Sequence, residues 1–166
     1  MNESNIDKNK LSIELTEALT VYQLLEITLR NYVNSMQKYI NFRTEGVLNF
    51  KGKKLDRLSL GQLEKILAEL DDGSDLISKV KKAAERRNKV AHAAFANLIL
   101  NKERELNEIN SNIASWKADA MSLIADLVKS SLVLDKTHKE SLSKKIEESE
   151  ISIEAREGLL ERLLNI

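Results

Sequence analysis

The chain has 166 residues, enough for one domain with a substantial core, and it contains no proline, no cysteine and only five glycines. Charged residues make up 31% of it and balance to a formal net charge of zero, which excludes a global attraction to nucleic acid or to an anionic membrane. The absence of cysteine excludes disulfides and thiolate metal sites and fits a reducing compartment.

Helix-forming residues dominate the composition and aromatic residues are few, which predicts an all-α fold. We expect a helical bundle of about five helices, two of them long, built from residues 1–166 as a single domain. The polar residues 1–9 are expected to be disordered. The chain has neither a secretory signal nor a long apolar run, so we expect a soluble, cytoplasmic protein without a membrane partner.

The first long helix is predicted from about Leu11 to Tyr39, where apolar residues recur at alternating steps of four and three. Such spacing is typical of a long helix that packs nearly parallel to a neighbour. Four further apolar residues widen the stripe, which favours a bundle core over a two-stranded coiled coil: Val21, Leu24, Val33 and Ile40.

Residues 44–56 lack helical periodicity and are expected to form a loop. Ser59 and Gln62 have the spacing of a capping box, which predicts the start of a short helix. A break at residues 71–74, with Ser74 as the cap, precedes a third helix. This helix extends to about Leu100 or bends near residues 93–97.

A second long helix follows, with an apolar series that runs from Ile109 to Leu127, and we expect it to end near Asp135. Thr137 and Glu140 have the spacing of another capping box, so residues 135–166 are predicted to form a C-terminal helix. His138 would then lie at the exposed start of that helix, as an ordinary surface residue.

The third helix carries most of the chemistry that the sequence offers. Between Ser78 and His92 six basic residues stand against Glu85 alone, a local excess of five positive charges. Arg87 falls in line with apolar residues of this helix, where an arginine is costly unless something pairs with it. Either the helix bends here, or Arg87 faces a cleft or a second subunit. The basic residues are Lys79, Lys81, Lys82, Arg86, Arg87 and Lys89.

The segment Arg87-Asn88-x-x-x-His92 resembles the R-x4-6-H motif of the HEPN family (higher eukaryotes and prokaryotes nucleotide-binding), whose members are small helical bundles. Arg86 also fits the spacing, but only Arg87 is followed by a polar residue of the family type. Ala94 stands where the best-known toxin branch has a tyrosine. The resemblance covers the motif and a compatible helix layout.

The resemblance implies a metal-independent endoribonuclease, of the kind found in toxin–antitoxin and phage-defence (abortive-infection) systems. Two copies of the motif would meet across a homodimer interface, with Arg87 and His92 as catalytic residues and Asn88 in support. An imidazole can move protons near neutral pH, and a guanidinium can hold phosphate oxygens. Flanking cations would bind the RNA backbone: Lys79, Lys82, Arg86 and Lys89.

Other interpretations remain open. Two histidines 46 positions apart, in a chain without cysteine, do not suggest a zinc site, and we expect no metal and no cofactor. Besides RNA and a second copy, an antitoxin or another defence protein is a possible partner. The alternatives are a non-catalytic interaction or RNA-binding module of the same fold, and an unrelated helical interaction protein in which Asn88 and His92 simply hydrogen-bond to each other.

Overall fold

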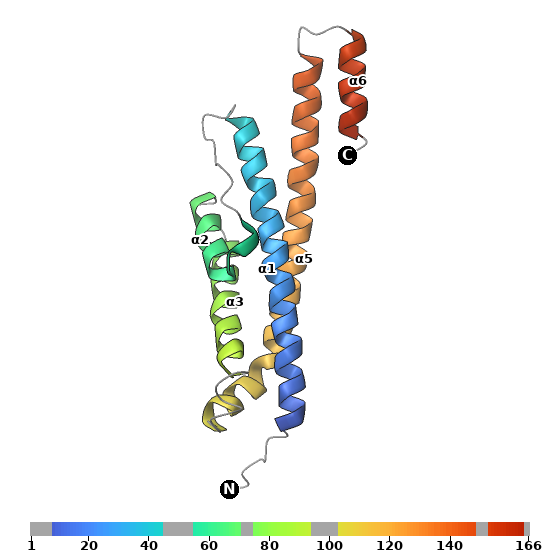
Figure 1. Cartoon of the computed structure of the whole chain (residues 1–166). Helices are drawn as coiled ribbons and strands as arrows, with labels where there is room; N and C mark the ends of the chain where they lie inside the picture. The colour runs from blue at the N-terminus through green and yellow to red at the C-terminus, as the bar shows by residue number, and fades with distance from the viewer. Residues whose placement is uncertain (1–7, 45–54, 71–74, 94–102, 149–152, 165–166) are drawn as a thin grey trace.

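The computed structural model describes residues 8–44, 55–70, 75–93, 103–148 and 153–164, and within these ranges the chain is helical apart from short turns. It has no strand there, and two of its five α-helices are long, which confirms the all-α bundle (Figure 1). The elements are α1 (Lys8–Arg43), the 3-10 helix η1 (Leu55–Arg57), α2 (Leu60–Leu70), α3 (Asp75–His92), α5 (Glu103–Glu147) and α6 (Ile153–Leu164).

The predicted apolar stripe of α1 is its buried face, as the four-three spacing indicates. The flanking prediction was only partly correct, because Val33 is buried whereas Leu24 is 45% exposed. Lys8 and Asn9 already belong to α1, so the expected disorder does not extend to them, and residues 1–7 lie outside the described ranges. The buried residues of the stripe are Leu11, Leu15, Ala18, Tyr22, Leu25, Leu29 and Tyr32.

Helices α1 and α5 run parallel, side by side, along most of their length (Figure 1). Near the start of both, Lys117 of α5 binds Glu14 and Glu17 of α1, at 2.5 and 2.8 Å from Nζ to the carboxylate oxygens. Near the end of α1, the rings of Phe42 and His138 are 5.0 Å apart. The order of these contacts is the same in both helices, which fixes their parallel direction.

The short helices α2 and α3 pack on one side of this pair. Gln62 caps the start of α2 as predicted, since its Oε1 accepts a hydrogen bond from the Ser59 backbone amide at 2.9 Å. The Ser59 hydroxyl lies 3.2 Å from the same oxygen, so only the glutamine half of the capping box forms. Arg30 of α1 holds η1 in place by donating its Nε–H to the Leu55 carbonyl at 2.8 Å.

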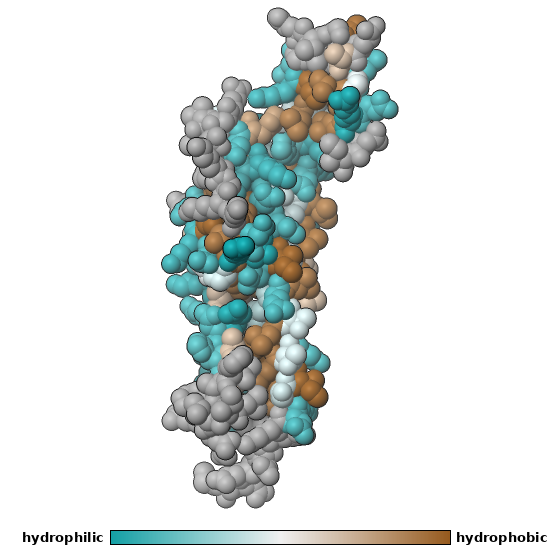
Figure 2. All heavy atoms as spheres, in the orientation of Figure 1, coloured by the Kyte–Doolittle hydropathy of each residue, from teal (hydrophilic) through white to brown (hydrophobic). Residues whose placement is uncertain are grey.

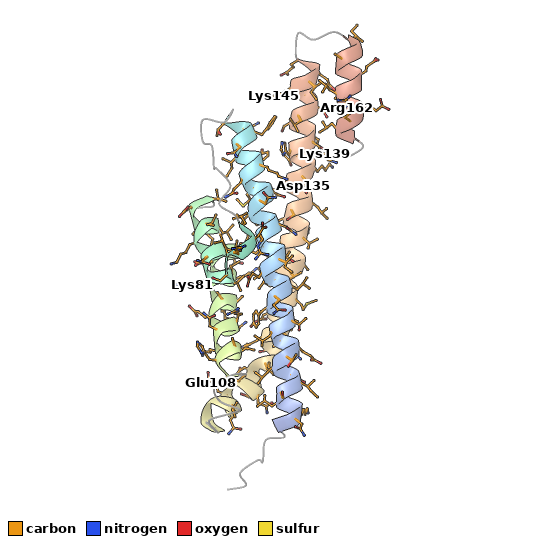
Figure 3. All side chains as sticks on the ribbon, in the orientation of Figure 1. Lys81, Glu108, Asp135, Lys139, Lys145 and Arg162 are labelled. Atoms are coloured by element: carbon orange, nitrogen blue, oxygen red, sulfur yellow. The ribbon has the colours of Figure 1, made fainter. Side chains whose placement is uncertain are left out.

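The predicted end of the second long helix at Asp135 is wrong. Helix α5 continues through Glu147, and Asp135, Lys139 and Lys145 follow one another along its uninterrupted length (Figure 3). Thr137 does not cap a new helix. Its hydroxyl donates instead to the Val133 carbonyl, 2.9 Å away and four residues back. No glycine or proline interrupts this stretch, so the helix has no reason to stop.

The C-terminal helix is therefore α6 rather than residues 135–166, and it folds back along the end of α5 (Figure 1). The buried apolar residues of α1, η1, α2, α3 and α5 form one cluster. Among its described side chains, α6 adds none to this cluster. The predicted loop falls largely in residues 45–54, and both the Ser74 cap and the path after Ala93 also lie outside the described ranges.

Candidate functional site

Arg87 lies on the inward-facing side of α3, and its side chain is half-buried. Within the described part of the chain its only polar partner is the next residue. Arg87 Nη1 lies 3.4 Å from the Asn88 Oδ1, a weak contact between neighbours. No described carboxylate lies within ion-pairing distance of the guanidinium. The conflict expected from the sequence, a cation in an apolar stripe without an acidic partner, is therefore present in the single chain.

His92 is the last residue of α3, and its side chain is exposed. It makes no hydrogen bond with any described residue. It stands five residues after Arg87, about 7.5 Å further along the axis and 140° round the helix. One chain thus places Arg87, Asn88 and His92 on one turn and a half of α3 but does not bring the arginine and the histidine into contact. A site that uses both on one phosphate needs a second copy.

Three other cations of this segment, Arg86, Lys89 and Lys79, lie on a different side of α3, which faces α5. Arg86 Nη1 lies 2.6 Å from Asp119, and Lys89 Nζ lies 3.3 Å from Glu108. Lys79 is bound in the same way, to Asp75 at 2.9 Å and to Asp126 at 3.7 Å. Three of the six cations counted along the sequence are therefore paired with carboxylates of α3 or α5.

Three residues that the sequence analysis did not single out gather on this α5 side. Trp116 is buried beneath two of the cations, with Arg86 at 5.7 Å and Lys89 at 5.9 Å from its ring centroid. Asp119 forms an ion pair with Arg86, and Tyr22 of α1 lines the same pocket as these residues. Two of the three had a signal in the sequence, because Tyr22 and Trp116 are aromatic residues with a polar group that lie inside the apolar stripes of α1 and α5. Asp119 had none.

Together these residues line a pocket of about 260 Å3 between α1, α3 and α5. The Tyr22 hydroxyl is fully buried and has no hydrogen-bond partner in the described part of the chain. Burial raises the pKa of Tyr22 to about 12. By smaller amounts, the positive charge of Arg86 lowers this pKa and the negative charge of Asp119 raises it. The lining residues are Tyr22, Lys79, Lys82, Ala83, Arg86, Trp116, Asp119, Ala120, Ser122 and Leu123.

His138 is not the exposed surface residue that the sequence suggested. It is half-buried between the two long helices, 5.0 Å from the Phe42 ring and 6.3 Å from the Tyr39 ring. Burial lowers the pKa of His138, an effect that Asp135 opposes and Lys38 reinforces. The expectation was wrong because it assumed that a helix ends at Asp135, whereas α5 continues through that residue.

Six of the nine large apolar side chains that are exposed among the described residues lie on the outer side of α1 and α5, and we call them the outer apolar face. Ile13 precedes Glu17 by one turn and Met121 follows Lys117 by one turn. Because Glu17 and Lys117 pair, the exposed apolar residues one turn from each of them lie on the same side of the α1–α5 contact. Figure 2 shows apolar side chains at the surface along the two long helices. Asp119, which pairs with α3, lies about 160° round α5 from Met121. The face comprises Ile13, Leu24, Ile27, Met121, Val128 and Leu132, each between 45% and 65% exposed.

No group of three or more acidic or histidine side chains that could hold a metal ion occurs among the described residues. Within the same ranges, no helix is long and apolar enough to cross a membrane. Comparison of the chain with protein-family models, with curated proteins and with solved structures finds no match. The resemblance to HEPN proteins therefore depends on the Arg87-Asn88-x-x-x-His92 motif and the helical layout.

Proposed function

We propose that the protein is a metal-independent endoribonuclease of the HEPN type, active as a homodimer. The observation that carries the proposal is Arg87, a half-buried guanidinium with no carboxylate partner among the described residues. An uncompensated buried cation is unfavourable, and an anion such as an RNA phosphate would relieve that cost. The exposed His92, one turn and a half away on the same helix, adds the proton-transfer group.

The chemistry needs only protons and charge stabilisation. The 2′-hydroxyl of RNA attacks the adjacent phosphorus while the bond to the 5′-oxygen breaks, which leaves a 2′,3′-cyclic phosphate and a 5′-hydroxyl. In a dimer, one His92 accepts the 2′-proton and the other donates a proton to the leaving oxygen, a contribution typically worth about 10²–10⁴-fold. Arg87 binds the non-bridging oxygens, and Asn88 orients the guanidinium or the phosphate.

The supporting cations have unequal roles in this proposal. Lys82 has no partner among the described side chains and remains available to an RNA backbone, whereas Arg86, Lys79 and Lys89 are paired. To bind RNA, each of these three cations would have to break its ion pair with a carboxylate and form one with a phosphate, so each would add less affinity than an unpaired cation. We extend the proposal to a cytoplasmic role in a toxin–antitoxin or phage-defence system, with an antitoxin or defence protein as partner.

The test is incubation of the purified protein with a mixed RNA pool in EDTA, followed by analysis of the product ends. We expect 2′,3′-cyclic phosphates, and no cleavage by His92→Ala or Arg87→Ala at unchanged helical content and dimerisation. Lys82→Ala should weaken RNA binding and lower its salt dependence without removing cleavage. Cleavage that requires a divalent metal, or that survives His92→Ala, would refute the mechanism.

The outer apolar face favours a second candidate, a non-catalytic assembly module in which a second copy packs along α1 and α5. Six exposed residues of α5 recur at steps of four and three, the spacing of a seam between long helices. The Thr16 and Thr20 hydroxyls of α1 bond to carbonyls four residues back, so both can be covered at little cost. The α5 series is Ala114, Ala118, Met121, Ala125, Val128 and Leu132.

The two candidates predict dimers with different interfaces, one at α3 and the other along α1 and α5. The chain has no cysteine, so single cysteines can be introduced and spin-labelled. Glu85→Cys places a label two turns before His92 on the same face of α3, and Val128→Cys places one on the outer apolar face. A short distance between copies at position 85 supports the ribonuclease dimer. A short distance only at position 128 supports the assembly module and removes the composite site.

A further inference from the structure

The pocket between α1, α3 and α5 contains neither of the proposed catalytic residues, although Lys79, Lys82 and Arg86 line it and are also proposed RNA contacts. Its α3 residues, Lys82 and Arg86 among them, face α5. Arg87 lies about 100° round the helix from Arg86, and His92 lies about 80° from Lys82 on the side remote from α5. Because neither Arg87 nor His92 lines the pocket, binding of a small ligand there does not depend on the proposed cleavage chemistry.

The first sign of a ligand site is the Tyr22 hydroxyl. Tyr22 lines the pocket and is only 1% exposed, and its hydroxyl has no hydrogen-bond partner among the described residues. Leaving a buried hydroxyl without a partner is unfavourable, and native proteins rarely keep such a group without a reason. Phenylalanine would fill the same space without that cost. A ligand oxygen that accepts from the Tyr22 O–H would explain why a tyrosine stands there.

The second sign is the charge of the lining. Arg86 is neutralised by Asp119, and Lys79 lies between Asp75 and Asp126. Lys82 has no such partner among the described residues, so the pocket keeps one uncompensated ammonium group. Arg86 uses only Nη1 toward Asp119, which leaves its other N–H groups as donors at the pocket wall.

The third sign is the remaining wall, which is apolar. Ala83, Ala120 and Leu123 line the pocket beside Trp116, and the small alanines leave room for a flat group against the helices. Trp116 is the only tryptophan in the chain, and its ring already holds Arg86 at 5.7 Å. A volume of about 260 Å3 is close to the small end of known ligand pockets.

We propose that this pocket binds a small, flat molecule that carries one anionic oxygen group, either a carboxylate or a phosphate monoester. The anionic group accepts hydrogen bonds from the Tyr22 O–H and the Lys82 ammonium, and the flat body packs against Ala83 and Trp116. Asp119 keeps Arg86 in place at the rim. One anionic group is expected, because the lining has one uncompensated cation.

Phenyl phosphate and benzoate are suitable probes, since they share a ring and differ in the anionic group. Benzamide has nearly the shape of benzoate without the charge. Binding is followed by the ¹⁵N signal of the Trp116 indole, which is unique in the chain. We expect saturable shifts with one or both acids at dissociation constants on the order of 1 mM or below, and none with benzamide. The acid that binds more tightly identifies the anionic group.

Three variants of the full-length protein complete the test. Tyr22→Phe and Lys82→Met should each weaken binding of the tighter acid by about tenfold. Lys81→Met is the matched control, because Lys81 lies on the side of α3 turned away from α5 (Figure 3), and it should leave binding unchanged. Tyr22→Phe should also raise the unfolding temperature of the free protein, since it removes an unsatisfied hydroxyl.

Equal binding of benzamide would overturn the proposal, as would the absence of saturable shifts with both acids. Loss of binding in Lys81→Met to the same extent as in Lys82→Met would also overturn it, because only a general charge effect would then remain. If Tyr22→Phe raises stability while binding persists undiminished, the hydroxyl serves no ligand. Lys82→Met is a surface change, so the test does not depend on how well Tyr22→Phe folds.

Discussion

Two adjacent arginines on α3 have opposite surroundings, so exchanging each for methionine should change stability in opposite directions. Methionine keeps the length of the side chain and removes its charge. Arg87 is half-buried with no described carboxylate in reach, so Arg87→Met should raise the free energy of unfolding by about 1 kcal/mol. For a chain of this size, that corresponds to a rise of about 2–4 °C in the unfolding temperature.

Arg86→Met is the matched control. Arg86 is 16% exposed, binds Asp119 at 2.6 Å and covers the Trp116 ring. Asp119 is 60% exposed, so solvent screens much of the ion pair. Together with the cation–π contact, its loss should lower the free energy of unfolding by about 1 kcal/mol.

The assay is chemical denaturation followed by far-UV circular dichroism, with RNA cleavage measured on the same preparations. Arg87→Met should be more stable than the parent protein and inactive, which is the pattern of a residue kept for function at the expense of stability. If Arg87→Met loses as much stability as Arg86→Met, Arg87 has a structural partner. The observation that carries the ribonuclease proposal would then be explained by folding alone.

Three further predictions concern the long helices. Lys139→Pro should cost about 3 kcal/mol, because it falls inside continuous α5; a near-neutral result in denaturation would instead place a helix start at Thr137. Lys117 holds the pKa of the Glu14 carboxyl below its usual 4.5. The stability from this contact is therefore present above pH 4.5 and is lost as the pH falls through the lowered pKa. Lys117→Met should flatten that part of a pH–stability profile. Burial lowers the pKa of His138 below 6.5, so the unfolded chain binds the proton first and the free energy of unfolding falls as the pH drops below 6.5. His138→Phe should remove this pH dependence. An unchanged profile in the variant would contradict the prediction.

Several features of the fold followed from the sequence because they depend on local periodicity. The four-three spacing located the buried faces of α1 and of the first half of α5, since a side chain's position round a helix depends only on its residue number. Ser59 and Gln62 located the start of α2, because a capping box is made by residues three apart. The motif Arg87-Asn88-x-x-x-His92 was likewise visible as a spacing on one helix.

Other features depend on which helices become neighbours, and periodicity within one helix contains no such information. Helix α5 passes Asp135 because nothing in that stretch breaks it and because His138 packs against Phe42. The expected end relied on a capping pattern whose threonine bonds back into its own helix instead. Leu24 likewise belongs to an apolar pattern and yet remains exposed, because none of the described helices covers that side of α1.

The difference between the two arginines shows the same limit at the candidate site. Arg86 and Arg87 are neighbours in sequence and both belong to the basic run, but Asp119 reaches only Arg86, across 33 positions. The pocket is also a product of tertiary packing, since Tyr22, Lys82 and Trp116 come from three helices. The sequence by itself determined the helices and their buried faces. The packing of those helices decided which charges are neutralised and which polar groups are left for a ligand, because both depend on distances between residues far apart in the chain.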